Sequence, residues 1–252
     1  MKAIYSISIS VATSVLLAFS APVHAAKIDS RIELSAKQSY AFVTYLQGDD
    51  IKIQSNDGAV TLTGIVSENF HKLLAQETVA GLPGVKSVDN RLEVKGEPPT
   101  ANSDAWLRDK VKVTLLFHRS VSAGTTEVDV KDGIVTLRGD AASQAQKELT
   151  TAYARDVEGV KDVKNEMTVS KTSEMTMARV VGKIDDASIT AQIKMTLLYH
   201  RSTSALNTKV ETKLGMVTLY GKARNAAEKD LVTKLVNDIN GVKSVNNRMT
   251  IE

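Results

Sequence analysis

Two spacings of apolar residues alternate along the chain. Apolar positions three or four residues apart predict one face of a helix, whereas strict alternation with polar residues predicts a half-buried strand. After residue 103 a helical stripe precedes two strand-like runs, 128–130 and 134–137, and the same stripe recurs after residue 185. The two stripes consist of Leu107, Val111, Thr114 and Leu115, and of Ile189, Ile193, Thr196 and Leu197.

Glycine-ended strands mark three copies of one unit. They run over residues 58–64, 133–139 and 215–221, and 20 residues after each a Gly-Val-Lys-x-Val-x-Asn run begins. The copies are offset by 75 and 82 residues, which is longer than the roughly 20–50 residues of a solenoid repeat. We therefore predict three tandem domains. Their boundaries are 29–95, 103–170 and 185–252.

Turn residues separate the first two strands of each unit. Asp57-Gly58 and Asp132-Gly133 predict tight hairpins, because both residues of such a turn must tolerate positive φ. Leu214-Gly215 predicts a weaker turn at the third hairpin.

A second helix is predicted after each hairpin. Ser143 with Gln146, and Asn225 with Glu228, form capping-box patterns at its start, whereas Ser67 is followed three residues later by an apolar residue. A last strand closes each unit. The predicted fold class is α+β, with three tandem αββαβ units that each place two helices on one face of a three-stranded sheet.

The first 25 residues predict a secretory signal peptide. Lys2 gives a positive start, residues 4–19 carry no charge, and the small residues Val23 and Ala25 stand before the expected cleavage point. The apolar run is shorter than the roughly 20 residues that a membrane anchor needs. The chain has no cysteine, so neither a disulfide framework nor a lipid on cysteine is expected. We expect a soluble periplasmic protein.

The glycine-ended strand, the helix and the Gly-Val-x-x-Val-x-Asn run, in this order, resemble the BON domain. The resemblance covers essentially the whole chain after the signal peptide, and it implies the same helix–strand–strand–helix–strand fold. The family is named for osmotically inducible periplasmic proteins and nodulation proteins. The resemblance implies a periplasmic stress protein, with phospholipid-surface binding, envelope integrity or chaperone-like help to exported proteins as its role. The family has no catalytic motif to carry over.

The residues themselves provide no recognisable catalytic or metal site. Phosphate-binding loops, zinc-protease motifs and nucleophile elbows are all missing from the sequence. His118 and His200 occupy one repeat position, each followed by arginine. They are interpreted either as metal ligands between copies or, preferably, as helix-end residues that complement the helix dipole. We expect no enzyme, no metal and no cofactor.

A second apolar stripe lies on the first helix of the middle copy. It comprises Trp106, Val113 and Phe117, with the basic residues Lys110 and Arg119 beside it. A tryptophan-bearing stripe bordered by bases fits an interfacial helix on anionic lipid, and packing of Trp106 against a neighbouring copy is the alternative. Tyr199 and Arg201 continue the candidate lipid-binding set in the last copy, where Ser188 replaces the tryptophan.

Charge favours a different copy from the one that carries the tryptophan. Residues 29–95 carry seven basic and nine acidic side chains, whereas residues 172–252 carry twelve basic and eight acidic ones. The total of +3 is too small to indicate nucleic-acid binding. The expected partner is an anionic phospholipid surface or, alternatively, exported client proteins. A scaffold of docked copies is the third hypothesis, and the sequence does not define the oligomeric state.

Overall fold

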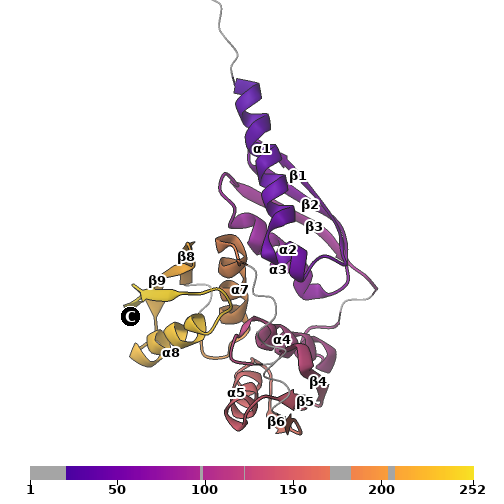
Figure 1. The fold of residues 1–252 in the computed structure, drawn as a ribbon, viewed down its shortest axis with the longest axis vertical. Helices are drawn as coiled ribbons and strands as arrows, with labels where there is room; N and C mark the ends of the chain where they lie inside the picture. Colours follow the sequence, from indigo (N-terminus) through magenta and orange to yellow (C-terminus); the bar gives the residue numbers. More distant parts are fainter. Residues whose placement is uncertain (1–20, 97–98, 122, 171–182, 204–207) are drawn as a thin grey trace, which may run out of the picture.

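The computed structural model describes residues 21–96, 99–121, 123–170, 183–203 and 208–252. They form three α+β modules, the first at residues 21–96, the second at 103–170 and the third at 183–252 (Figure 1). The predicted fold class is confirmed. Most of the expected signal peptide lies outside the described residues, as do Met175, Met177, Val180 and Val181, which stand between the second and third predicted domains.

Each module follows the order helix, strand, strand, helix, strand, and the first module has one additional short helix. In the first module these are α1(Ala21–Gln38), α2(Tyr40–Thr44), β1(Asp50–Asn56), β2(Ala59–Val66), α3(Asn69–Ala80) and β3(Ser87–Val94). In the second they are α4(Asp104–Phe117), the 3-10 turn η1(Ala123–Thr125), β4(Thr126–Lys131), β5(Ile134–Ala141), α5(Gln144–Arg155), β6(Asp162–Asn165) and β7(Thr168–Val169). In the third they are α7(Asp186–Tyr199), β8(Thr208–Lys213), β9(Met216–Ala223), α8(Ala226–Asn237), β10(Ser244–Asn247) and β11(Thr250–Ile251).

The central strand of each sheet pairs on both sides. β5 is antiparallel to β4, with Lys131 opposite Ile134, and parallel to β6, with Val135 opposite Val163. Alternate residues of β5 are buried, as expected for a sheet with helices on one face. In the second and third modules the last strand is split in two, β6 with β7 and β10 with β11.

The repeated asparagine fastens this last strand to the second helix. In the second module the Asn165 side-chain amide donates to the carbonyl of Lys147 at 2.9 Å and to the hydroxyl of Thr151 at 2.7 Å. Its side-chain oxygen accepts from the amide of Met167. Asn90 and Asn247 make the equivalent bonds. The asparagine side chain therefore bonds both to the backbone two residues later and to the second helix.

All three hairpin turns have the same backbone conformation, including the one expected to be weaker. Asp57, Asp132 and Leu214 have φ of 50°, 55° and 54°. In each module a carboxylate of the first helix accepts the two amides of the turn. Asp186 binds the amides of Leu214 at 2.7 Å and Gly215 at 2.8 Å, and Asp29 and Asp104 act likewise.

The second helices begin as the capping patterns predict. The amide of Gln146 donates to Ser143 Oγ, and that of Glu228 donates to Asn225 Oδ1. In the first module the N-cap is Glu68, which makes no side-chain cap bond. Nearby, Asp49 accepts from the amide and hydroxyl of Ser67 and lies 2.6 Å from His71.

Helix α7 lies where the three modules meet (Figure 1). The first module docks on it: the amide of Tyr40 donates to Asp185 Oδ2, and the amide of Ala41 donates to Ser188 Oγ. Lys194 of α7 pairs with Glu77 of α3 at 2.7 Å. The first and third modules share one hydrophobic core, and most of the second module forms another. In the described part of the chain, no helix combines the length and apolar character required to cross a membrane.

Candidate binding surfaces of the three modules

The candidate lipid-binding residues of α4 lie in two different places. Some surround the half-buried Trp106, and others belong to the core. Trp106 is half-buried and lies against Lys110, whose ammonium is 4.1 Å from the centre of the indole ring and 5.6 Å from that of Tyr199. The Lys110 side chain also donates to the carbonyl of Glu158 at 3.2 Å. Of these contacts, the one between Lys110 and Tyr199 joins the second module to the third.

Burial governs the electrostatics of this cluster. It lowers the pKa of Lys110, although the Glu158 carboxylate at 3.6 Å acts in the opposite direction. Burial, assisted by the charge of Asp109, raises the pKa of Tyr199 to about 12. A lysine that is only 4% exposed does not present its charge to a surface. Lys110 therefore acts as a joint between modules in this arrangement.

Val113 and Phe117 belong to the core between the modules. They are 1% and 0% exposed, and the Phe117 ring packs edge-on against Tyr45 of the first module with 5.6 Å between ring centres. The second apolar stripe of α4 therefore packs against neighbouring modules. Neither side chain reaches the surface in this arrangement.

Arg119 and Arg201 make reciprocal contacts between the second and third modules. Arg119 Nη2 donates to carbonyls that follow α8, including Ile239 at 2.9 Å and Val242 at 2.8 Å. Arg201 Nη2 donates to carbonyls that follow α5, including Val157 at 3.1 Å and Val160 at 3.0 Å. Each arginine thus donates to backbone carbonyls in the loop that follows a helix of the other module.

His118 and His200 are the C-cap residues of α4 and α7, as the helix-end interpretation expects. His118 stacks on Tyr153 with 3.9 Å between ring centres, and its Nδ1 is 3.3 Å from Asp238 of the third module. Burial lowers the pKa of His200; the charges of Arg201 and His118 also lower it, and Asp156 opposes them. Within the described residues, no group of three histidine, cysteine, aspartate or glutamate side chains is placed to hold a metal.

The serine, histidine and aspartate at the start of α3 do not form a nucleophilic triad. Ser67 Oγ and Asp49 Oδ2 both contact the same ring nitrogen of His71, Nδ1, at 3.2 Å and 2.6 Å. A catalytic triad needs the serine on one nitrogen and the carboxylate on the other. This cluster instead holds the loop that precedes the helix.

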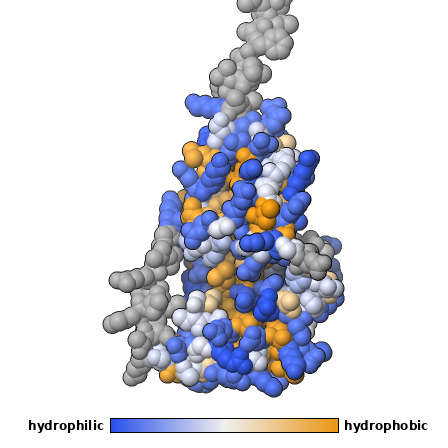
Figure 2. All heavy atoms as spheres, turned by 90° about the vertical axis from the view of Figure 1, so that its right-hand side faces the viewer, coloured by the Kyte–Doolittle hydropathy of each residue, from blue (hydrophilic) through white to orange (hydrophobic). Residues whose placement is uncertain are grey.

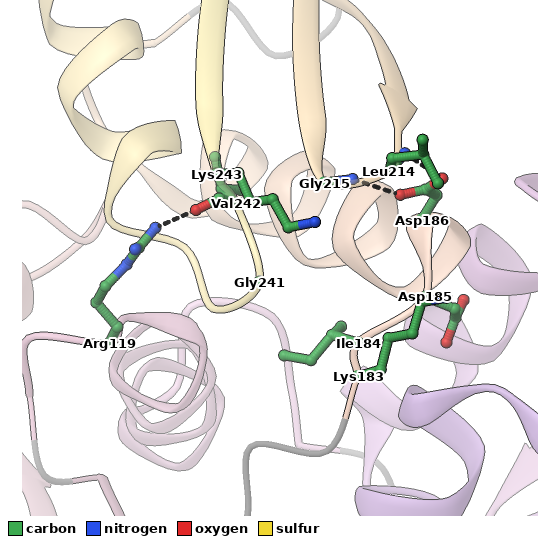
Figure 3. Close-up of a pocket in the computed structure, with 10 residues that line it drawn as sticks. All are labelled: Arg119, Lys183, Ile184, Asp185, Asp186, Leu214, Gly215, Gly241, Val242 and Lys243. Carbon is green, nitrogen blue, oxygen red and sulfur yellow. Dashed lines mark hydrogen bonds between the residues drawn. The ribbon is translucent and has the colours of Figure 1, made fainter. Parts of the chain in front are cut away.

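A cavity of about 620 Å³ lies beside the start of α7 and the third hairpin (Figure 3). Ile184 and Val242 give it apolar walls. Lys183 and Lys243 are both exposed, and neither ammonium group hydrogen-bonds to another described residue. Figure 3 shows the Lys243 side chain extending into the space between the hairpin and residues 183–185.

The acidic residues that line this cavity are already hydrogen-bonded. Asp186 accepts the turn amides, and Asp185 accepts from Ser188 and from the amide of Tyr40. Arg119, on the opposite wall, is occupied by backbone carbonyls. The lining thus combines three basic with two acidic side chains, and Lys183 and Lys243 are its exposed cations. Sequence reasoning missed this site, and the signals for it were the basic C-terminal third and the replacement of aspartate by Leu214.

A smaller hollow separates the first module from the second. It has a volume of about 250 Å³ and is lined mainly by apolar side chains, with Glu68, Lys112 and Thr126 among them. The apolar lining residues are Phe70, Val113, Leu115, Leu116, Ala123 and Val128. Figure 2 views the molecule from the right-hand side of Figure 1 and shows apolar patches between hydrophilic side chains on that face.

Comparisons with known proteins match this organisation. The model of the BON domain matches residues 28–96, 103–171 and 185–252. Osmotically-inducible protein Y of Escherichia coli is 33% identical over 144 residues, 57% of this chain and 70% of that protein. Outer membrane lipoprotein DolP of Haemophilus influenzae is 31% identical over 114 residues, 45% of this chain and 56% of that protein.

Among solved structures, CdsD, a structural protein of the type III secretion system of Chlamydia trachomatis, covers 91% of each chain at 18% identity. Its TM-score of 0.25 carries no argument about this chain. The family assignment depends on the three matched segments and on the relatives above 30% identity. The chain belongs to the BON domain family.

Proposed function

We propose that this chain is a non-enzymatic periplasmic protein of the envelope stress response that attaches to anionic phospholipid surfaces. The observation that carries the proposal is the cavity beside α7, where Lys183 and Lys243 are exposed and the neighbouring carboxylates are hydrogen-bonded internally. Such cations are available for lipid phosphates. Attachment through the third module replaces the Trp106 helix as the principal contact, because the stripe on that helix is largely used between modules.

Charge distribution supports the same module. Residues 172–252 carry four more basic than acidic side chains, and residues 29–95 carry two fewer basic than acidic ones. An exposed basic region is attracted to an anionic surface at low ionic strength, and the attraction is screened over about 10 Å at 0.1 M salt. The names of two relatives, one osmotically inducible and one an outer membrane lipoprotein, support a place in the envelope.

Vesicle co-sedimentation tests this proposal. The chain without residues 1–25 is expected to bind vesicles that contain anionic lipid at low salt, and to bind zwitterionic vesicles or high-salt samples much less. K183Q with K243Q is expected to weaken binding several-fold. K52Q, which removes an exposed lysine from the acidic first module, is the matched control. Absence of binding to anionic vesicles at low salt would exclude the proposal.

The second candidate function is a chaperone or adaptor for exported proteins. The hollow between the first two modules favours it, because a mainly apolar lining suits an apolar side chain of a partly folded client. In a client aggregation assay, protection is expected to fall when V128S makes the lining polar. Absence of protection at molar excess would remove this candidate.

A further inference from the structure

The third hairpin differs from the other two at its tip. Leu214 occupies the turn position of Asp57 and Asp132 and is 62% exposed, and Met216 beside it is 52% exposed. The three turns otherwise share one conformation and one pattern of amide bonds. Only in the third module does this position carry an apolar side chain, which also lines the rim of the cavity beside α7.

Leucine is a poor residue for this backbone conformation. At φ of 54° its Cβ crowds the following carbonyl, a strain that aspartate and asparagine tolerate better. Asp186 holds the turn in place through the amides of Leu214 and Gly215. The fold therefore tolerates a strained and exposed leucine where the same turn elsewhere has an aspartate. Neither packing nor local preference explains this residue.

Lysines surround the apolar tip. Lys213 precedes Leu214 and is exposed. The stem of Lys243 lies beside Gly215, since a Cβ added to that glycine would be 3.2 Å from its Cγ. In the second module the equivalent Lys161 donates to the carbonyl of Asp132. The aspartate of the turn is itself missing from the third tip, which leaves a small apolar surface beside two lysines, with the Asp186 carboxylate bound to the turn amides.

We propose that Leu214 and Met216 insert into the interfacial layer of an anionic bilayer while Lys213 and Lys243 meet the lipid phosphates. This inference rests on the proposed function and assigns the residues that enter the membrane. Apolar side chains next to exposed bases match the two layers of an anionic membrane surface. A second copy of the chain fits this tip less well, because the lysines of the two copies would repel each other.

The test uses two substitutions that the fold should accept. L214N keeps the charge unchanged and introduces a residue suited to positive φ. M216T introduces a β-branched residue at the start of β9. I251T is the matched control, because Ile251 is also 52% exposed and lies in the same module, with β11 paired to the opposite end of β9. Partition into anionic vesicles is measured for each, after denaturant unfolding has verified folding.

About tenfold weaker partition is expected for L214N and a smaller loss for M216T, with no change for I251T. L214W in a W106F background adds a direct readout: lipids brominated near the headgroup should quench its fluorescence. If the wild type binds and both tip variants bind equally well, the tip does not insert, although the proposed function survives. If the wild type does not bind, the proposed function fails and the inference fails with it.

Discussion

Helices α4 and α7 hold the same place in successive modules, yet their surroundings are opposite. On α4 the residue three positions after the N-cap is Trp106, which is half-buried beside Lys110. On α7 it is Ser188, which is completely buried and accepts a hydrogen bond from the first module. The difference shows that the neighbouring module, rather than the fold of the repeat, determines which residue this position needs.

Exchanging these two residues tests the difference between the helices. The largest loss of stability is expected for S188W. No space for an indole exists at a fully buried serine, so the substitution should cost about 3 kcal/mol or force the first module off α7. The reverse change, W106S, should cost about 1–2 kcal/mol, since it removes a half-buried ring. Denaturant unfolding measures both. Equal effects at the two positions would contradict the assigned environments.

Loss of either arginine should destabilise the interface between the second and third modules to the same extent. R119A and R201A each remove a set of carbonyl contacts across the same interface. Each is expected to lower the free energy of unfolding by about 2 kcal/mol, because charge-assisted bonds to helix-end carbonyls are lost. Lysine should not restore stability, since its point charge lacks the fork of the guanidinium. R91A, at an exposed surface pair with Asp89, is the control and should change little.

Lowering the pH should weaken the interface between the second and third modules through His200. Because its pKa is lowered in the folded state, the neutral ring contributes stability above the ordinary value of 6.5, and this contribution is lost as the pH falls through the lowered pKa. The denaturant midpoint should therefore fall between pH 7 and 5, and H200Q should show a smaller fall. Asp156, Arg201 and His118 are the charged or titratable groups that influence the ring.

Asp238 should act in a separate range of pH. Burial raises its pKa, but its interactions with His118, Ser120 and Tyr153 outweigh burial, so that the pKa is lowered from 3.8. Its contribution is present above that ordinary value and is lost only at more acidic pH. A midpoint that stays constant in wild type from pH 7 to 5 would contradict the assignment to His200.

The smallest change in stability is expected for substitutions in the hairpin turns. L214N should raise stability by less than about 1 kcal/mol, because asparagine relieves the strain at positive φ. D132L should lower stability by a similar amount, because it introduces that strain into the second module. Thermal unfolding of the two variants under identical conditions provides the measurement. A stabilising D132L would show that strain does not differ between these turns.

The parts of the fold that the sequence predicts are those determined by residues close together in the chain. Helical spacing placed the stripe of Leu107 and Val111 on α4, Asp132-Gly133 formed the expected turn, and Ser143 capped α5. Each of these features depends on residues close together in the chain. Periodicity and turn chemistry therefore suffice to assign the elements of each repeat.

The contacts between modules could not be predicted in the same way. Nothing near Arg119 in sequence indicates that it reaches carbonyls about 120 residues later. The stripe of Val113 and Phe117 is equally suited to a membrane and to a neighbouring module by composition alone. Asp104 holds a turn 28 residues away, an interaction that appears only when the hairpin folds back on the helix. These features are set by tertiary geometry.

The paired arginine contacts also give the interface between the second and third modules an approximate twofold character. Because the second and third modules present corresponding surfaces to each other, their interface is nearly isologous, and such contacts close after two partners instead of propagating as a head-to-tail array does. Both arginines and both sets of helix-end carbonyls are engaged within the chain. The first module has Val43-Thr44 at the corresponding place and offers no such arginine. The interface between the second and third modules is in this way completed within a single chain.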